Sequence, residues 1–441
     1  MKSGIDKKLV RLAWLMWGTA MAAQLLNLFH RIAGATVADR LMADFNLTAT
    51  AVGTLMALLF YVYGFMQFPS GALADSLGPR KTLSFGCLIA ALGSIVFSLA
   101  PSLPILFVGR FLLSLGVSVV FVSVLKVATE WFRSRDFGFI AALTVVVCQG
   151  GALIATTPLA LLVTWAGWRA SFQLIGLLSL GICLACWLII RNRPHDLGLP
   201  PPSEVEEEQS ASPALSSTGA SLSFGQRVRL VFTNPYTWPP FMVGIGLYGT
   251  LLTFIGAWGI PYLMQVYDMT RSTAANFMLL VTIGIMLGSI IIAHVSNRVM
   301  QRRKLPAIIS TLAYLCLWLL LTFWNAGRLS PQALGAICFL LGFFTGYQSQ
   351  NLACVKEVTS PVVSGMAMGV VNIGPFLTPA VLQPLFGRIL DLGWQGAVFE
   401  GARVYPMEAF HSAFLLICGV AAISAVGAFL VKETRCRNLV T

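Results

Sequence analysis

Twelve apolar stretches of about 20 residues recur along the 441 residues, and no other feature constrains the fold as strongly. A helix needs about 20 predominantly apolar residues to cross a hydrocarbon core of about 30 Å. Hydrophobic residues make up 57% of the chain and charged residues only 10%, whereas a soluble domain carries roughly 25% charged residues. The pattern therefore predicts an all-α membrane protein with 12 transmembrane helices. The expected helices cover residues 12–36, 50–72, 82–100, 104–128, 138–164, 171–190, 239–263, 274–296, 306–325, 333–355, 364–388 and 410–431.

The basic residues favour one side of the predicted membrane. With the amino terminus placed inside, most lysines and arginines of the loops and tails fall on the inner side. The arginines that fall outside are Arg40, Arg169, Arg271, Arg328, Arg388 and Arg403. This bias predicts a multi-pass protein of the inner (plasma) membrane with both termini cytoplasmic. The net charge of +12 does not indicate nucleic acid, because a nucleic-acid face would gather its basic residues on one soluble surface.

One long polar stretch, Arg191–Trp238, separates the first six apolar stretches from the last six. It contains consecutive prolines at 200–202 and an acidic run at 204–208, a composition typical of a flexible linker. The sequence therefore predicts an N-terminal six-helix bundle at 1–190, a cytoplasmic linker at 191–238, a C-terminal six-helix bundle at 239–432 and a cytoplasmic tail at 433–441.

A short charged loop between the second and third apolar stretches reads Gly-Ala-Leu-Ala-Asp-Ser-Leu-Gly-Pro-Arg-Lys-Thr-Leu, from Gly71 to Leu83. It resembles the signature loop of the major facilitator superfamily, Gly-x-Leu-Ala-Asp-Arg-x-Gly-Arg-Arg-x-x-Leu. Ser76 and Pro79 each replace a usual arginine, so the ion pairs of those arginines are not expected here. The matching positions are Gly71, Leu73, Ala74, Asp75, Gly78, Arg80 and Leu83.

The resemblance extends over essentially the whole chain. Arg110 with Gly116 resembles the family's fourth-helix motif, and Gly288–Lys304 is a degenerate second copy of the signature loop, with Asn297 in place of its aspartate. The entry to the predicted sixth helix, Gly167-Trp168-Arg169, also matches the family pattern. The resemblance implies two six-helix bundles related by a pseudo-two-fold axis along the membrane normal, with the substrate between them near the midplane. The residues it implies in gating are Gly71, Asp75, Gly78, Arg80, Lys81 and Arg110.

Ionisable side chains inside the apolar stretches indicate functional sites. Placing each one in a membrane helix costs about 2.5–3.5 kcal/mol on insertion scales, and such a side chain usually faces a cavity or a partner. In the organic-anion branches that the chain resembles, an arginine on the first helix faces the central cavity. The resemblance therefore implies that Arg31 binds the anion, since a guanidinium holds a carboxylate or phosphate through two hydrogen bonds. Snorkelling of Arg31 to the outer interface is the alternative. His30 is a candidate for proton coupling, or else hydrogen-bonds a neighbouring helix, and Arg110 is expected to be structural.

Lys126 and Lys356 occupy corresponding places in the two halves. They either flank a shared pathway or snorkel to the cytoplasmic interface. Glu357 is the second candidate for proton coupling, with an exposed loop acid or a structural partner for a cation as alternatives. The predicted substrate-binding residues are Arg31, Lys126, Lys356, Gln24, Tyr61, Gln149, Trp258, Tyr262, Gln350 and Asn372.

Together these features predict a secondary active transporter that moves a small organic anion by alternating access, as a proton-coupled symporter and a functional monomer. Two alternatives remain open: a drug or metabolite effluxer working by proton antiport, and a membrane sensor with a transporter fold. The fifth-helix antiporter motif is not reproduced at residues 147–151, which argues against the effluxer. No paired-acid, His-Glu-x-x-His or serine-elbow pattern lies in the apolar stretches, so no enzyme is predicted. We expect no cofactor, no metal and no nucleic-acid partner.

Overall fold

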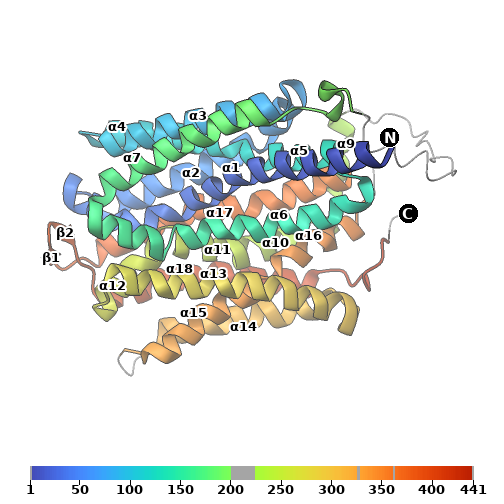
Figure 1. Cartoon of the computed structure of the whole chain (residues 1–441). Coiled ribbons are helices and arrows are strands. Elements are labelled where there is room, and N and C mark those ends of the chain that lie inside the picture. The colour runs from blue at the N-terminus through green and yellow to red at the C-terminus, as the bar shows by residue number, and fades with distance from the viewer. Residues whose placement is uncertain (1, 200–223, 325–327, 361–362, 440–441) are drawn as a thin grey trace. The chain divides into compact units, whose positions relative to one another are not determined.

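The computed structural model describes residues 2–199, 224–324, 328–360 and 363–439, and the described chain is almost entirely helical (Figure 1). Much of the predicted linker, 200–223, lies outside the described residues. The chain divides into two compact units. Unit 1 comprises Met1–Arg31, Phe65–Ala155 and Trp165–Ala220, and unit 2 comprises Ile32–Gly64, Thr156–Thr164 and Ser221–Thr441. Unit 2 therefore contains residues from both predicted six-helix halves.

Seven long helices precede the linker. They are α1 (Lys2–Phe45), α2 (Ala49–Ser76), α3 (Gly78–Leu99), α4 (Leu103–Ser118), α5 (Val120–Trp131), α6 (Ser134–Ile154) and α7 (Thr157–Ile189). In unit 1, α3 runs beside α4 and α7 (Figure 1). The indole of Trp17 on α1 donates to Thr144 Oγ1 on α6 at 3.0 Å, which ties these two helices together.

The first helix is longer than predicted, ending at Phe45 rather than at residue 36. Residues 37–45 contain neither glycine nor proline, so nothing in them interrupts the helix. Asn46, at φ 50°, adopts the left-handed conformation that ends many helices. Thr48 Oγ1 then accepts from the backbone N–H of Ala51 at 3.2 Å and starts α2. Arg40 and Asp39 consequently lie on a helix and not in the predicted loop.

Three predicted helices are divided differently in the structure. The predicted helix 104–128 consists of α4 and α5, which meet at Val119. The predicted helices 138–164 and 171–190 are instead α6 and α7, and α7 bends at Gly167, where φ is 78° and ψ is 162°. Over the described residues, ten helical stretches are long and apolar enough to cross a membrane. The twelve-helix, two-bundle prediction fits this helical content, since Val147–Ile189 combines parts of two predicted helices and the predicted helix 333–355 is divided into the shorter helices Pro331–Thr345 and Gln348–Glu357.

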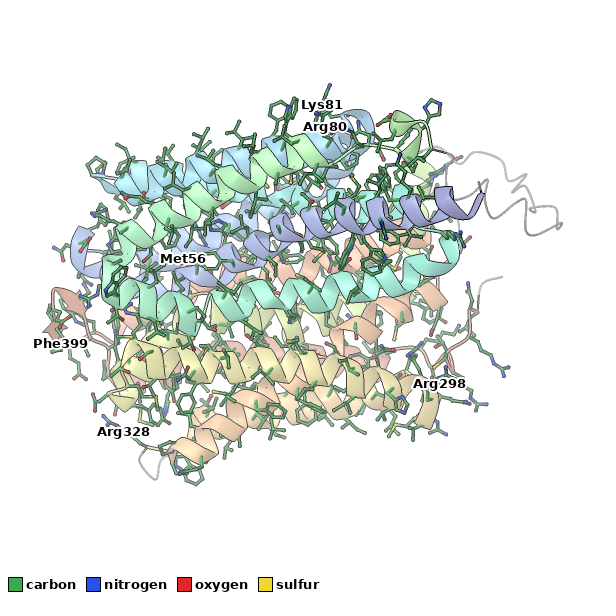
Figure 2. All side chains as sticks on the ribbon, in the orientation of Figure 1. Met56, Arg80, Lys81, Arg298, Arg328 and Phe399 are labelled. Carbon is green, nitrogen blue, oxygen red and sulfur yellow. The ribbon has the colours of Figure 1, made fainter. Side chains whose placement is uncertain are left out.

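Short elements follow α7 within the predicted linker, and the second half continues with further short elements and longer helices. They are η1 (Pro194–Leu197), α9 (Phe224–Thr233), η2 (Pro235–Thr237), α10 (Trp238–Gly244), η3 (Ile245–Gly249), α11 (Thr250–Thr253), η4 (Phe254–Trp258), α12 (Gly259–Tyr267), α13 (Arg271–His294), η5 (Val295–Met300), α14 (Lys304–Phe323), α15 (Pro331–Thr345), α16 (Gln348–Glu357), α17 (Ser364–Leu392), β1 (Val398–Phe399), β2 (Ala402–Arg403) and α18 (Met407–Leu430). The strands form a hairpin near α12, at the opposite end of unit 2 from Arg298 (Figures 1 and 2).

Helices α2 and α17 touch backbone to backbone in unit 2. A Cβ atom at Gly387 would lie 2.3 Å from the carbonyl oxygen of Ala49, and one at Gly53 would lie 2.3 Å from the carbonyl oxygen of Gln383. Small residues allow such close approach between membrane helices. Neither position has room for a side chain.

We expect Gly387→Ala to destabilise the protein by about 1–3 kcal/mol, the usual cost of overpacking, because the contacted atom belongs to a backbone. Gly369→Ala is the matched control, since Gly369 is exposed on the same helix and no atom lies within 4 Å of its added Cβ. Thermal unfolding in detergent should show a lower melting temperature for Gly387→Ala alone. Equal melting temperatures for the two variants would contradict the close crossing.

Candidate functional site

Three buried polar side chains form a row on one face of α1 in unit 1. Gln24, Asn27 and Arg31 follow one another at spacings of three and four residues, which place them on the same face of a helix. Asn27 Nδ2 donates to Gln24 Oε1 at 3.2 Å, and Arg31 Nε donates to Asn27 Oδ1 at 3.3 Å. Gln24 Nε2 in turn donates to Cys148 Sγ on α6 at 3.3 Å. We call these residues the α1 polar row.

His30 and Arg110 form a second buried polar group in unit 1. Arg110 Nη1 donates to the backbone oxygen of His30 at 3.3 Å, and the His30 ring packs edge-on against Phe29. Within the part of the chain that the structure describes, no hydrogen-bond partner reaches either ring nitrogen of His30, or Nε and Nη2 of Arg110. Burying such groups without partners costs free energy. This region of α1 and α4 is therefore positively charged and incompletely hydrogen-bonded.

The signature loop packs against the chain that follows α7. Gly78 has φ 78°, and a Cβ there would lie 2.5 Å from Asn192 Oδ1. The same oxygen accepts from the backbone N–H of Arg80 at 3.0 Å, and Arg80 Nε donates to the carbonyl oxygen of Trp187 at 2.8 Å. Lys81 is exposed beside Arg80 (Figure 2). Gly71 borders open space, with no atom within 4 Å of an added Cβ.

Lys126 on α5 contacts the acidic residue of the signature loop. Its Nζ lies 3.0 Å from Asp75 Oδ1 and 3.3 Å from Glu130 Oε1. Glu130 also lies 3.7 Å from Arg193 Nε. Lys126 therefore connects α5 to the signature loop.

Arg303, buried in unit 2, is the centre of a polar network around the second copy of the signature loop. Its Nη2 lies 2.6 Å from Glu357 Oε1. Its Nη1 donates to Gln350 Oε1 at 2.5 Å and also to Asn297 Oδ1. The backbone N–H of Arg303 donates to Glu433 Oε1 at 2.9 Å. Burial alone would raise the pKa of Glu433, but backbone N–H donors, that of Arg303 first, lower it overall.

The other predicted binding residues lie in different surroundings. Trp258 is buried, donates from Nε1 to the carbonyl oxygen of Gln383 at 3.3 Å, and stacks on Phe386 with ring centroids 5.3 Å apart. Tyr262 is buried among aromatic rings, with Phe414 at 4.9 Å. Tyr61 and Lys356 are exposed, and Gln149 and Asn372 are half-buried.

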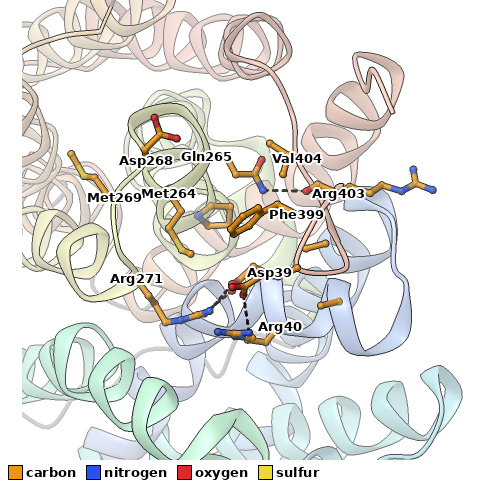
Figure 3. Close-up of a pocket in the computed structure, with 14 residues that line it drawn as sticks. Asp39, Arg40, Met264, Gln265, Asp268, Met269, Arg271, Phe399, Arg403 and Val404 are labelled. Carbon is orange, nitrogen blue, oxygen red and sulfur yellow. Dashed lines mark hydrogen bonds and ion pairs between the residues drawn. The ribbon is translucent and has the colours of Figure 1, made fainter. Parts of the chain in front are cut away.

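A buried ion pair joins α1 to α13 in unit 2 (Figure 3). Arg271 Nη1 lies 2.6 Å from Asp39 Oδ1, and Arg271 Nη2 lies 2.5 Å from Asp39 Oδ2. Arg271 also donates to the carbonyl oxygen of Thr36. This two-pronged geometry is the strongest form of an arginine–carboxylate contact. We call the end of unit 2 that contains Thr36, Asp39 and Arg271 the Asp39 end.

Asp391, at the end of α17, caps the beginning of α2. Its Oδ1 accepts from the backbone N–H of Ala49 at 3.0 Å, and its Oδ2 accepts from that of Thr50 at 2.8 Å. The Tyr405 hydroxyl donates to Asp391 Oδ1 at 2.8 Å. A carboxylate at a helix amino terminus satisfies unpaired N–H groups and matches the positive end of the helix dipole.

A cavity of about 420 Å³ opens at the Asp39 end, with Pro261, Met264 and Phe399 among its apolar walls (Figure 3). Each charged residue that lines it is paired with an opposite charge. The pairs are Asp39 with Arg271, Arg40 with Glu400, Asp268 with Arg328, and Arg403 with Asp391. The cavity therefore offers no surplus charge for an ionic ligand.

The structure groups some of the predicted residues and separates others. Gln24 and Arg31 share the α1 polar row, Lys126 lies with Asp75, and Gln350 lies with Glu357 around Arg303. Sequence reasoning missed Asn27, although its spacing from Gln24 and Arg31 is helical and visible in the sequence. It also missed the Asp39–Arg271 pair, because 232 residues separate the partners and no local pattern connects them.

Comparison with known proteins gives one family and several relatives. The family model described as Major Facilitator Superfamily matches residues 16–374. The membrane sensor protein UhpC of Salmonella typhimurium is 25% identical over 403 residues, covering 88% of this chain and 87% of that protein. A probable L-galactonate transporter of Escherichia coli is 25% identical over 252 residues, covering 56% of this chain and 53% of that protein.

Solved structures share the fold. A crystal structure of a bacterial homologue of the human lysosomal transporter Spinster, inward-facing and unoccupied, superposes with a TM-score of 0.72. Its sequence is 16% identical, and the match covers 95% of this chain and 97% of that one. At this identity the likeness concerns the fold alone.

Proposed function

The chain belongs to the Major Facilitator Superfamily, and from this premise we propose that it carries a small organic anion by alternating access, together with protons. It is a multi-pass membrane transporter of small solutes rather than an enzyme. The anionic class of the substrate, the coupling to protons, the inner-membrane location and action as a monomer are our proposals.

One observation carries the anion proposal: two arginines, Arg31 and Arg110, are buried on the membrane helices α1 and α4 of unit 1. Buried cations in a membrane protein mark substrate or ion pathways because of their cost. Arg31 extends the row of amides formed by Gln24 and Asn27, and a guanidinium is suited to a carboxylate or phosphate. The probable L-galactonate transporter among the relatives is named for a carboxylate solute. His30, buried beside Arg110, is our candidate for proton coupling.

We propose further that both termini are cytoplasmic, as the positive-inside distribution indicates. The signature loop then lies on the cytoplasmic side and the Asp39 end of unit 2 lies on the outer side. The halves 1–190 and 239–432 would act as the two bundles, joined by the linker at 191–238. Asp75, Gly78, Arg80 and Lys126 would close the cytoplasmic side, while the Asp39–Arg271 pair would close the outer side.

Uptake by the purified protein in vesicles tests the anion proposal. We expect uptake of L-galactonate, glycerol 3-phosphate or citrate, increased by an inward proton gradient. Arg31→Ala should reduce that uptake by at least about 30-fold, corresponding to about 2 kcal/mol for a lost charge pair. Arg40→Ala is the matched control on the same helix, because Arg40 is exposed and its pair with Glu400 contributes about 0–1 kcal/mol.

Three results would count against this function. Equal uptake by wild type and Arg31→Ala would remove Arg31 from the site. Uptake that does not change with the proton gradient would contradict the proposed proton coupling. Transport of tetraphenylphosphonium in place of the anions would favour the effluxer.

A membrane sensor is the second candidate, and the similarity to UhpC favours it. A sensor would bind an anion without moving it. Stabilisation by L-galactonate or glycerol 3-phosphate in a thermal-shift assay, combined with no uptake into vesicles, would support the sensor. Uptake that saturates with solute concentration would exclude it.

A further inference from the structure

The hydrogen bonds within the α1 polar row all point the same way along the helix, each residue donating to the row residue before it in the sequence. Arginine carries only donors, so the amide of Asn27 must turn its Oδ1 toward Arg31. Its Nδ2 then faces Gln24 Oε1, as observed. The two neighbours thus fix the orientation of the Asn27 amide, and the amide fixes the position of Arg31 Nε.

We infer that Asn27 is a positioning residue for Arg31, an inference that rests on the proposed anion function and specifies how the site meets its ligand. Because Asn27 accepts from Nε, an anion meets the edge of the guanidinium that its two Nη atoms form. A carboxylate, phosphate or sulfonate places two oxygens in one plane and matches this edge with two parallel hydrogen bonds. Chloride, a single atom, cannot form that pair.

The α1 polar row is packed against and hydrogen-bonded to α6. A Cβ at Gly151 would lie 2.0 Å from the carbonyl oxygen of Leu25, so the backbones of α6 and α1 touch one residue from Gln24. Gln24 also donates to Cys148 of α6. Arg31 is therefore braced through Asn27 and Gln24 onto a second helix. Holding a long side chain in its binding conformation reduces the entropy lost on binding.

The first test uses Asn27→Leu, which keeps the branched shape of the side chain and removes both hydrogen bonds. With purified full-length protein, L-galactonate and glycerol 3-phosphate should bind at least about tenfold more weakly to Asn27→Leu, as expected for a hydrogen bond to a charged group. Uptake should show a raised KM with little change in kcat. The loss should vanish in an Arg31→Lys background, since lysine has no Nε–H to hold. A packing role would lower the melting temperature in both backgrounds without this coupling.

The second test compares melting temperatures, which need no ligand, and adds anion binding by one variant. In Asn27→Asp the new carboxylate pairs with Arg31, so the protein should melt close to wild type while its affinity for both anions is lost. In the double variant Asn27→Asp/Arg31→Ala the carboxylate is buried without its cation, which is strongly destabilising. The double variant should melt well below the sum of the two single shifts. Additive shifts would overturn the contact between residues 27 and 31.

The outcomes separate this inference from the proposed function. If Arg31→Ala abolishes anion binding and Asn27→Leu binds as wild type does, the positioning role is wrong and the anion function stands. If neither anion binds wild type, the proposed anion function is wrong. The positioning role of Asn27 for an anion is then wrong too, even if the melting shifts of the two single variants are not additive.

Discussion

Replacing Arg271 by alanine is expected to destabilise the Asp39 end of unit 2 by about 3–5 kcal/mol, because it leaves a buried carboxylate without its cation. The pair is almost enclosed, with side-chain exposures of 6% for Arg271 and 19% for Asp39. In an alternating-access carrier, this end must open for the substrate to enter from outside. Loss of the pair should therefore raise the population of the open state by a factor of about 100 or more.

Labelling of a cysteine at position 36 measures this shift. Thr36 is fully buried and its carbonyl oxygen accepts from Arg271, so Thr36→Cys, in a protein with the native cysteines replaced, should react slowly with an impermeant maleimide. Arg271→Ala should accelerate the reaction, and Arg40→Ala should not. The exchanged pair Asp39→Arg/Arg271→Asp should slow it again. Equal labelling of Arg271→Ala and Arg40→Ala would show that the pair does not hold this end closed.

The fold could be predicted from the sequence because local composition is enough to identify membrane helices. Runs of apolar residues give the helices, and the signature loop at 71–83 gives the family, which the match over residues 16–374 confirms. The helix boundaries were less accurate, for local reasons. The first helix continued to Phe45 because its stop signal is Asn46 and not the end of the apolar run. The break predicted between residues 164 and 171 falls where Gly167 has non-helical φ and ψ, but the predicted helix 138–164 is itself divided at Ala155 into α6 and the start of α7.

The candidate site could be predicted only for residues that are unusual in their local sequence. Arg31 and Arg110 were visible because a charge inside an apolar stretch is rare. Asn27 was not singled out, although other amides of the apolar stretches were and its spacing from Gln24 and Arg31 is helical. Asp39 and Arg271 depend on helices that approach one another only in the folded chain. Whether the predicted substrate-binding residues act together in transport remains a prediction.

Glu357→Gln is expected to cost about 3–5 kcal/mol, since it removes the carboxylate partner of the buried cation Arg303. Glu357 lies 2.6 Å from Arg303 Nη2 and also accepts from Thr434 Oγ1. Such a residue is suited to holding the second signature-loop copy in place, the structural alternative that the sequence left open for it. The melting temperature of Glu357→Gln should therefore fall, and uptake should fall with it at every pH.

A coupling role for Glu357 would give the opposite pair of results. If its carboxyl carries the transported proton, Glu357→Gln should melt near wild type, and the residual uptake should no longer respond to an inward proton gradient. Lys356→Gln is the matched control for stability, because Lys356 is exposed one residue away on the same helix. It should melt as wild type does. A fall in melting temperature confined to Glu357→Gln would leave His30 as the remaining candidate for proton coupling, because a carboxylate that must hold Arg303 cannot give up its charge in each cycle without loosening unit 2.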